Sequence, residues 1–129
     1  AEAIVYGRLP LMITENCLVQ NAAGCRRDRE GPAVPADGPC RSQQLLRDRT
    51  GAAFPVLPAF GCRSEIENCK TLFLADKNDW KRLGLAFARL RFTTEPAEEC
   101  LRVLRRYSGA EEGWKPKEFT RGLFYRSVE

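Results

Sequence analysis

The sequence predicts a single domain of the α/β or α+β class. Its 129 residues are enough to build one hydrophobic core. The second half alternates strand-like and helix-like hydrophobic patterns, which indicates a β-α-β-α unit. The first half places cysteines around irregular backbone and a hairpin. We therefore divide the chain into a cysteine-rich part (residues 1–69), a β-α-β-α part (70–108) and an extended tail (109–129).

The cysteine-rich part begins with one predicted strand over residues 3–13, a stretch rich in Ile, Val, Tyr, Leu and Met. Pro10 has no N–H to donate to the ladder, so pairing is expected to loosen or shift there. Residues 14–41 have no clear periodicity and contain several glycines and prolines. A long irregular segment of this kind is typical of a functional loop or of disorder. Cys17, Cys25 and Cys40 frame it, which favours a functional loop.

A β-hairpin is predicted from the stretch RSQQLLRDRTGAAFPVL, residues 41–57. Apolar residues stand on both sides of the turn sequence DRTG. Gly51 supplies the positive φ that such a turn requires.

The β-α-β-α part starts with the continuous apolar run TLFLA at residues 71–75, which is typical of a buried strand. Asp76 or Asn78 is expected to cap a short helix that runs through Leu85. The alternating stretch ARLRF at 88–92 predicts a second strand. The two strands are expected to lie parallel, joined by a right-handed crossover.

A second helix follows, with Thr94 as its predicted cap and Pro96 in its first turn. Helical spacing predicts an inner face made of Ala97, Cys100, Leu101, Leu104 and Tyr107. The tail after residue 108 is polar with spaced aromatic residues, so we expect it to extend and dock back on the body. Trp80 and Trp114 are interpreted as packing residues.

Composition excludes several function classes. The chain has no histidine, which rules out Ser-His-Asp and Cys-His catalysis within it. It contains no phosphate-binding loop and no dinucleotide-binding glycine pattern. No apolar stretch approaches the roughly 18 residues of a membrane span, so no membrane partner is expected. The net charge of +4 is compatible with RNA or another anionic partner but does not require one.

The six cysteines are the strongest chemical signal, with the spacing C-x7-C-x14-C-x21-C-x6-C-x30-C. By spacing alone, disulfides, a metal site and inert thiols all remain open. Zinc is disfavoured because C-x2-C pairs are absent, whereas four thiolates could hold an iron–sulfur cluster. Cys17, Cys25, Cys40 and Cys62 lie on or next to irregular backbone. Cys69 and Cys100 are interpreted as structural.

The order of motifs resembles the peptidase U32 family. They are YGRLPLM, then NC, GC and a third cysteine, then LLRDRTGAAFPVL, CRSEIEN, LRFTTE and FTRGLFYR. The likeness runs across nearly the whole chain and is greatest to the branch that includes an enzyme hydroxylating a cytidine of large-subunit ribosomal RNA. The resemblance implies that the chain forms part of a U32 barrel. It also implies an excised C-terminal part of a U32 region, whose partner is the remainder of that protein.

The resemblance further implies a [4Fe-4S] cluster held by Cys17, Cys25, Cys40 and Cys62. Two departures bear on this: the family's cysteine shortly after the glycine matching Gly7 is missing, and the interval between Cys40 and Cys62 is shorter than in other branches. Cys17, Cys25 and Cys40 are therefore firmer matches than Cys62.

The function so implied is the cluster-bearing region of a cytoplasmic protein that hydroxylates RNA or a small molecule. The alternatives are a metal-dependent, collagenase-like peptidase and a non-enzymatic structural or RNA-docking fragment. In each case we expect this chain to be inactive alone. Three arginines of the cysteine loop could grip RNA phosphates, balance the charge of a cluster or be solvated: Arg26, Arg27 and Arg29.

Overall fold

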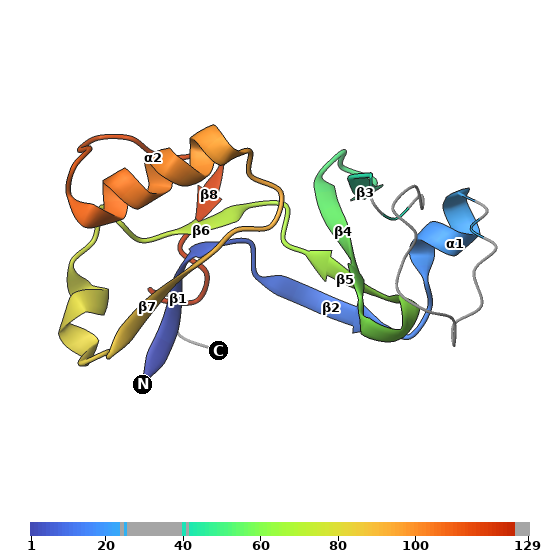
Figure 1. Cartoon of the computed structure of the whole chain (residues 1–129), viewed down its shortest axis with the longest axis horizontal. Helices are drawn as coiled ribbons and strands as arrows, with labels where there is room; N and C mark the ends of the chain where they lie inside the picture. Colours follow the sequence, from blue (N-terminus) through green and yellow to red (C-terminus); the bar gives the residue numbers. More distant parts are fainter. Residues whose placement is uncertain (24, 26–39, 41, 126–129) are drawn as a thin grey trace. The chain divides into compact units, whose positions relative to one another are not determined.

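The computed structural model describes residues 1–23, 25, 40 and 42–125, and they form an α+β fold with two four-stranded sheets (Figure 1). The chain divides into two compact units. The first unit combines Ala1–Leu9 with Lys70–Glu129, and the second unit is Pro10–Cys69. The expected boundary after residue 69 coincides with a change of unit, whereas Ala1–Leu9 belongs with the later part of the chain.

The sheet of the first unit has the strand order β7-β1-β6-β8. Strand β1 pairs in parallel with β7 and antiparallel with β6, so β6 and β7 run in opposite directions. The predicted parallel β6/β7 pair is therefore wrong: β1 lies between them. The expected docking of the tail is confirmed, because β8 adds to the edge of β6 in parallel. The bounds are β1 Glu2–Gly7, β6 Thr71–Phe73, β7 Phe87–Arg91 and β8 Phe119–Thr120.

Side chains alternate across this sheet and build two small cores. One core contains Val5, Leu72 and Leu74, and Trp80 packs against it. The other contains Tyr6, Phe73 and Val103, the last of these from helix α2 (Ala97–Ser108). As predicted, β6 is buried, and both tryptophans pack: Trp80 Nε1 donates to the Leu74 carbonyl at 3.0 Å, and Trp114 lies edge-on to Phe73.

Helix α2 differs from its prediction at its cap. Its N-cap residue is Pro96, which makes no side-chain cap bond, so the Thr94 assignment is wrong. The carboxylate of Glu95 instead accepts the backbone N–H groups of Thr93 and Thr94, at 2.7 and 3.1 Å. The side chain of Glu95 therefore organises the local turn, and Thr94 contributes only its backbone N–H.

The inner face of α2 is also rotated from the predicted one. Val103 is fully buried, whereas Leu101 and Leu104 are about half exposed and Ala97 is exposed. Only Cys100 and Tyr107 of the predicted face are partly buried. The rotation follows from β1, whose Tyr6 ring meets α2 and Tyr107, a neighbour that helical spacing alone does not reveal.

The short helix after β6 is a 3₁₀ turn, η3 (Asp79–Leu83), and ends before the predicted Leu85. Asn78 occupies the N-cap position but makes no side-chain cap bond. Gly84 has a φ of 65°, which ends the turn.

The second unit contains the sheet β2-β5-β4-β3, in which every neighbouring pair is antiparallel. The single strand predicted over 3–13 is wrong, because the chain leaves one sheet at Gly7 and enters the other at Pro10. The expected disturbance at Pro10 is present as a register shift before Met12. The bounds are β2 Pro10–Thr14, α1 Leu18–Ala23, β3 Gln44–Arg47, β4 Ala53–Ala59, η2 Phe60–Cys62 and β5 Arg63–Glu67.

The predicted hairpin is confirmed as β3 and β4, with Gly51 at a φ of 84° in its turn. Asp48 organises the turn, because its Oδ1 accepts the N–H and O–H of Thr50 and the N–H of Ala52. The bond from the Thr50 hydroxyl is the largest influence holding the pKa of Asp48 below its usual value. No helix in the described ranges is long and apolar enough to cross a membrane.

Candidate functional site

The strand pairings of the second unit bring four chain segments to one end of its sheet. Because β2 is antiparallel to β5, the end of β2 lies beside the start of β5. Since β4 is antiparallel to both β5 and β3, the end of β4 and the start of β3 face the same way. We call this the cysteine end of the sheet. Antiparallel topology alone therefore collects these segments.

Cys17 and Cys62 stand next to two neighbouring strands of the cysteine end, the edge strand β2 and the inner strand β5. Cys17 follows the end of β2 at Thr14 by three residues, and Cys62 directly precedes the start of β5 at Arg63. The pairing of Thr14 with Ser64 places these two strand ends side by side.

Cys40 and Cys25 belong to the same end by connectivity. Cys40 stands four residues before β3 begins at Gln44. Cys25 comes two residues after Ala23, where α1 ends, and α1 itself starts directly after Cys17 and contacts β5. Figure 1 shows α1 following the end of β2. All four predicted ligand cysteines thus belong to segments that enter or leave this end.

The two cysteines interpreted as structural lie elsewhere. Cys69 follows β5 at its opposite end, two residues beyond Glu67. Cys100 belongs to α2 of the first unit, and its thiol lies 3.8 Å from the carbonyl oxygen of Glu95. The assignment of four ligand and two structural cysteines stays a prediction.

Cys17 has a defined local geometry. Its sulfur caps α1 by accepting the backbone N–H of Gln20 at 3.3 Å. The next amide, of Leu18, donates to the hydroxyl of Ser64 in β5 at 3.0 Å. Just before it, the carboxylate of Glu15 pairs with the Arg63 guanidinium at 2.9 Å. Cys17 is therefore held between two links to the first residues of β5.

Cys62 has an unusual backbone. Its φ of 56° makes it the one non-glycine residue with positive φ in the described part of the chain. The preceding Gly61 also has a positive φ, 71°. A side chain in the left-handed region carries a conformational cost, and such outliers concentrate at functional sites. Two successive left-handed residues turn the chain sharply at the cysteine end.

The donor set suits an iron–sulfur cluster in kind. The four predicted ligand cysteines, all of them described residues, are partly buried and form no disulfide: Cys17, Cys25, Cys40 and Cys62. Among the described residues, however, no three Cys, Asp, Glu or His side chains lie close enough together to hold a metal ion. The structure thus brings together the strand ends next to Cys17 and Cys62, and it does not bring three sulfur atoms together among the described residues.

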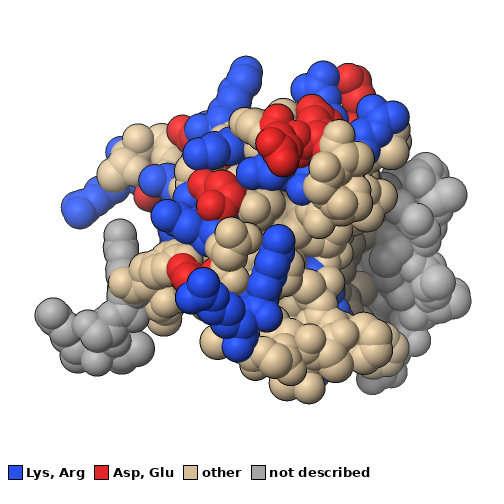
Figure 2. All heavy atoms as spheres, turned by 90° about the vertical axis from the view of Figure 1, so that its left-hand side faces the viewer, with Lys and Arg blue, Asp and Glu red and all other residues tan. Residues whose placement is uncertain are grey.

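The arginines proposed to grip RNA, Arg26, Arg27 and Arg29, lie outside the described residues. The first unit carries many Lys and Arg side chains, which are interspersed with Asp and Glu on the face shown in Figure 2. This mixed pattern is typical of a solvated surface.

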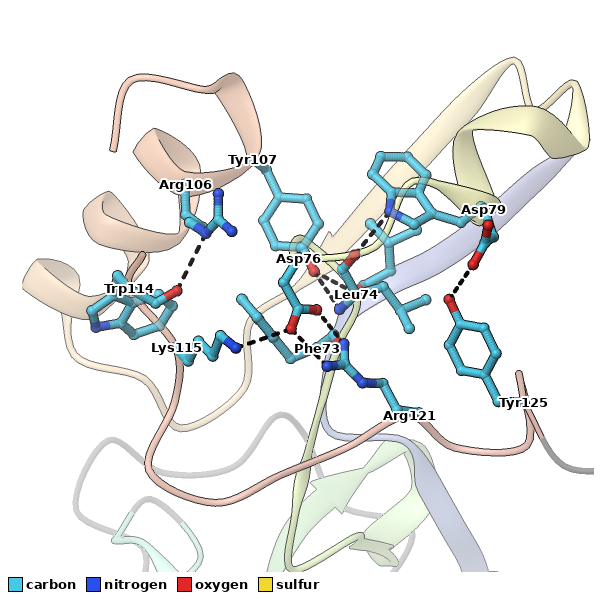
Figure 3. Close-up of polar contacts among 12 residues, drawn as sticks. Phe73, Leu74, Asp76, Asp79, Arg106, Tyr107, Trp114, Lys115, Arg121 and Tyr125 are labelled. Atoms are coloured by element: carbon cyan, nitrogen blue, oxygen red, sulfur yellow. Dashed lines mark hydrogen bonds and ion pairs between the residues drawn. The ribbon is translucent and has the colours of Figure 1, made fainter. Parts of the chain in front are cut away.

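A second polar cluster lies in the first unit and fixes the tail (Figure 3). The carboxylate of Asp76 binds both terminal nitrogens of Arg121, with Nη2 at 2.7 Å, and the amine of Lys115 at 3.2 Å. Arg121 also donates to the Phe73 carbonyl at 2.8 Å. Farther along the tail, the Tyr125 hydroxyl donates to Asp79 at 2.7 Å. These contacts hold the tail against β6 and η3.

Buried hydroxyls of the same unit are likewise structural. The Tyr107 hydroxyl accepts a hydrogen bond from the Leu74 N–H and donates one to the Val5 carbonyl. Burial raises the pKa of Tyr107 to about 12. Burial also raises the pKa of Tyr6.

We expect Asp76→Asn to destabilise the first unit by about 1–3 kcal/mol, because hydrogen bonds to a charged group are lost on both cations. The bonds from Arg121 hold the pKa of Asp76 well below its usual value. A lowered folded-state pKa means that this contribution is complete above the unfolded pKa of about 4 and fades as pH falls below it.

Urea denaturation of both proteins at pH 7 and at pH 3 measures this effect. The difference between wild type and Asp76→Asn should shrink at the lower pH. Asp79→Asn is the matched control, because its partner is a neutral tyrosine. Equal costs for the two variants would contradict an ion-pair role for Asp76.

No family model, no curated protein and no solved structure matches this chain.

Proposed function

We propose that the cysteine end is the ligand region of a [4Fe-4S] cluster, in a protein of the U32 type that hydroxylates RNA or a small molecule. The observation that carries the proposal is the sheet topology of the second unit. Antiparallel pairing brings together the strand ends next to Cys17 and Cys62 and leaves Cys69 at the opposite end of β5. Cys25 and Cys40 stand near this end in the sequence, two residues after α1 and four residues before β3. The order of sequence motifs supports the same four residues.

The chain's own residues contribute ligands and positioning. A cluster bound by four thiolates would supply one-electron chemistry. Cys17 and Cys62 would hold it from adjacent strand ends, and the Gln20 amide already donates to the Cys17 sulfur. Hydrogen bonds to ligand sulfur tune the potential of such clusters. The absence of histidine leaves thiolates as the chain's soft ligands.

Anaerobic reconstitution tests the proposal. The purified chain is incubated with ferrous iron, sulfide and a thiol reductant, then desalted. We expect close to four iron and four sulfide per chain, as the composition of the cluster requires, with a broad visible absorbance band. Spectroscopy of the reduced state identifies the cluster type. A chain that keeps no iron after desalting would contradict the proposal. A chain that binds zinc but no iron would indicate a structural zinc site in place of a cluster.

Cys62→Gly separates stability from ligation. Glycine adopts a positive φ without strain, so the variant should be more stable than the wild type by about 1 kcal/mol without a cluster. The same variant should fail to retain iron because a thiolate is gone. Thermal unfolding of the apo proteins and iron analysis after reconstitution measure the two effects.

Cys62→Ala is the matched control for the left-handed backbone, since it loses the sulfur but keeps the strain. It should gain no stability and should also lose iron. If Cys62→Gly retains iron as the wild type does, Cys62 is not a ligand.

A further inference from the structure

We infer that Ser64 is a positioning residue, which holds Cys17 beside Cys62 so that both can bind one cluster. The inference rests on the proposed function. Ser64 is the second residue of β5 and follows Cys62 by two positions. Its side chain is only 1% exposed, and its hydroxyl oxygen accepts the Leu18 amide at 3.0 Å.

The Leu18 amide needs such an acceptor. Leu18 is the first residue of α1, and the first amides of a helix have no partner within the helix. Cys17 satisfies the amide of Gln20 with its own sulfur, which leaves the Leu18 amide to be met from outside the helix. Ser64 meets it from a neighbouring strand. The hydrogen bond therefore fixes the peptide that joins Cys17 to Leu18 onto β5.

A second link between these segments is weaker. Glu15 and Arg63 form an ion pair at 2.9 Å, but their side chains are 77% and 42% exposed. Exposed pairs of this kind are screened by salt and contribute little. The buried hydroxyl of Ser64 is therefore the link expected to set the position of Cys17 relative to the chain that carries Cys62.

Residues that orient metal ligands typically change metal affinity by about 10- to 100-fold when they are replaced. Without the Ser64 hydroxyl, Cys17 keeps its sulfur but loses its tie to β5. The cluster should still form, because the four thiolates remain, and it should be released more readily.

Two variants of equal size isolate the hydroxyl. Ser64→Thr keeps the oxygen, whereas Ser64→Val has the same shape without it. We expect a chelator to remove iron from the Ser64→Val protein about 10-fold faster than from the wild type, with Ser64→Thr close to the wild type. The loss of visible absorbance under anaerobic conditions measures the rate.

Thr14→Val is the matched control. It also removes a hydroxyl that accepts a backbone amide, that of Asn16 at 3.2 Å, but this bond stays within one segment. Its release rate should equal that of the wild type. Hydrogen exchange of the apo proteins gives an independent readout, because only Ser64→Val should expose the Leu18 amide.

The outcomes distinguish the two levels of the argument. Equal release rates for Ser64→Val and Ser64→Thr overturn the role of Ser64 and leave the cluster proposal standing. A wild type that takes up no iron overturns the cluster proposal, and the role of Ser64 with it. If neither variant folds, hydrogen exchange of the Leu18 amide in the cluster-loaded wild type still tests the role of Ser64. A Leu18 amide exchanging as fast as an unstructured one would then contradict the inference.

Discussion

Serine at Cys17, Cys25, Cys40 or Cys62 is expected to abolish stable iron binding, with little loss of folding stability in the apo protein. A serine oxygen is a poor ligand for iron–sulfur clusters compared with a thiolate. Cys17→Ser is the clearest case, because Cys17 caps α1 and serine is a favoured N-cap residue. Loss of iron in this variant would therefore reflect loss of the sulfur and not loss of the helix.

Cys69→Ser and Cys100→Ser are the matched controls. They remove one thiol each from positions outside the cysteine end. Both should retain the iron and sulfide content of the wild type after the same anaerobic reconstitution, measured by colorimetric assay. The assignment of four ligands would be wrong if these two lost as much iron as the other four.

Gly7→Ala should destabilise the first unit by about 3–5 kcal/mol, the sum of backbone strain and forced overpacking. Gly7 ends β1 with a φ of 124°, a region that only glycine enters readily. A Cβ there would lie 2.1 Å from the backbone oxygen of Arg91 in β7. Because that neighbour is backbone in a paired strand, the sheet itself would have to move.

Gly109→Ala separates the two contributions. Gly109 follows α2 with a φ of 82°, but nothing lies within 4 Å of a Cβ placed there. This variant should cost about 1 kcal/mol from strain alone. Urea denaturation followed by circular dichroism measures both changes. Similar losses of unfolding free energy in the two variants would show that the close approach of β1 and β7 adds nothing to the cost of Gly7→Ala.

Local patterns predicted the elements whose cause is local. The hairpin of β3 and β4 follows from its turn, where Asp48 and Gly51 supply the hydrogen bonds and the positive φ. The continuous apolar run of β6 predicted its burial, because a strand covered on both faces has no polar side to present. The docking of the aromatic tail was also predictable from its composition, though not its partner strand.

The features that local patterns predicted wrongly depend on pairing between strands that are distant in the sequence. The chain over residues 3–13 looks like one apolar strand, yet it serves two sheets, because β1 ends at Gly7 and β2 begins at Pro10 with different partner strands. Because β1 lies between β6 and β7, these two strands run in opposite directions and not in parallel as predicted. The same strand brought Tyr6 against α2 and selected Val103 as the buried residue of that helix.

By itself the sequence favoured thiolates as the soft ligands of any metal site, because it has six cysteines and no histidine. It also indicated which four cysteines stand next to irregular backbone. Only the tertiary structure decided that the strand ends next to Cys17 and Cys62 lie side by side, that Cys62 has a positive φ and that Ser64 ties Cys17 to β5. The physical reason is that ligand sites depend on antiparallel register between distant segments, which spacing along one chain does not encode.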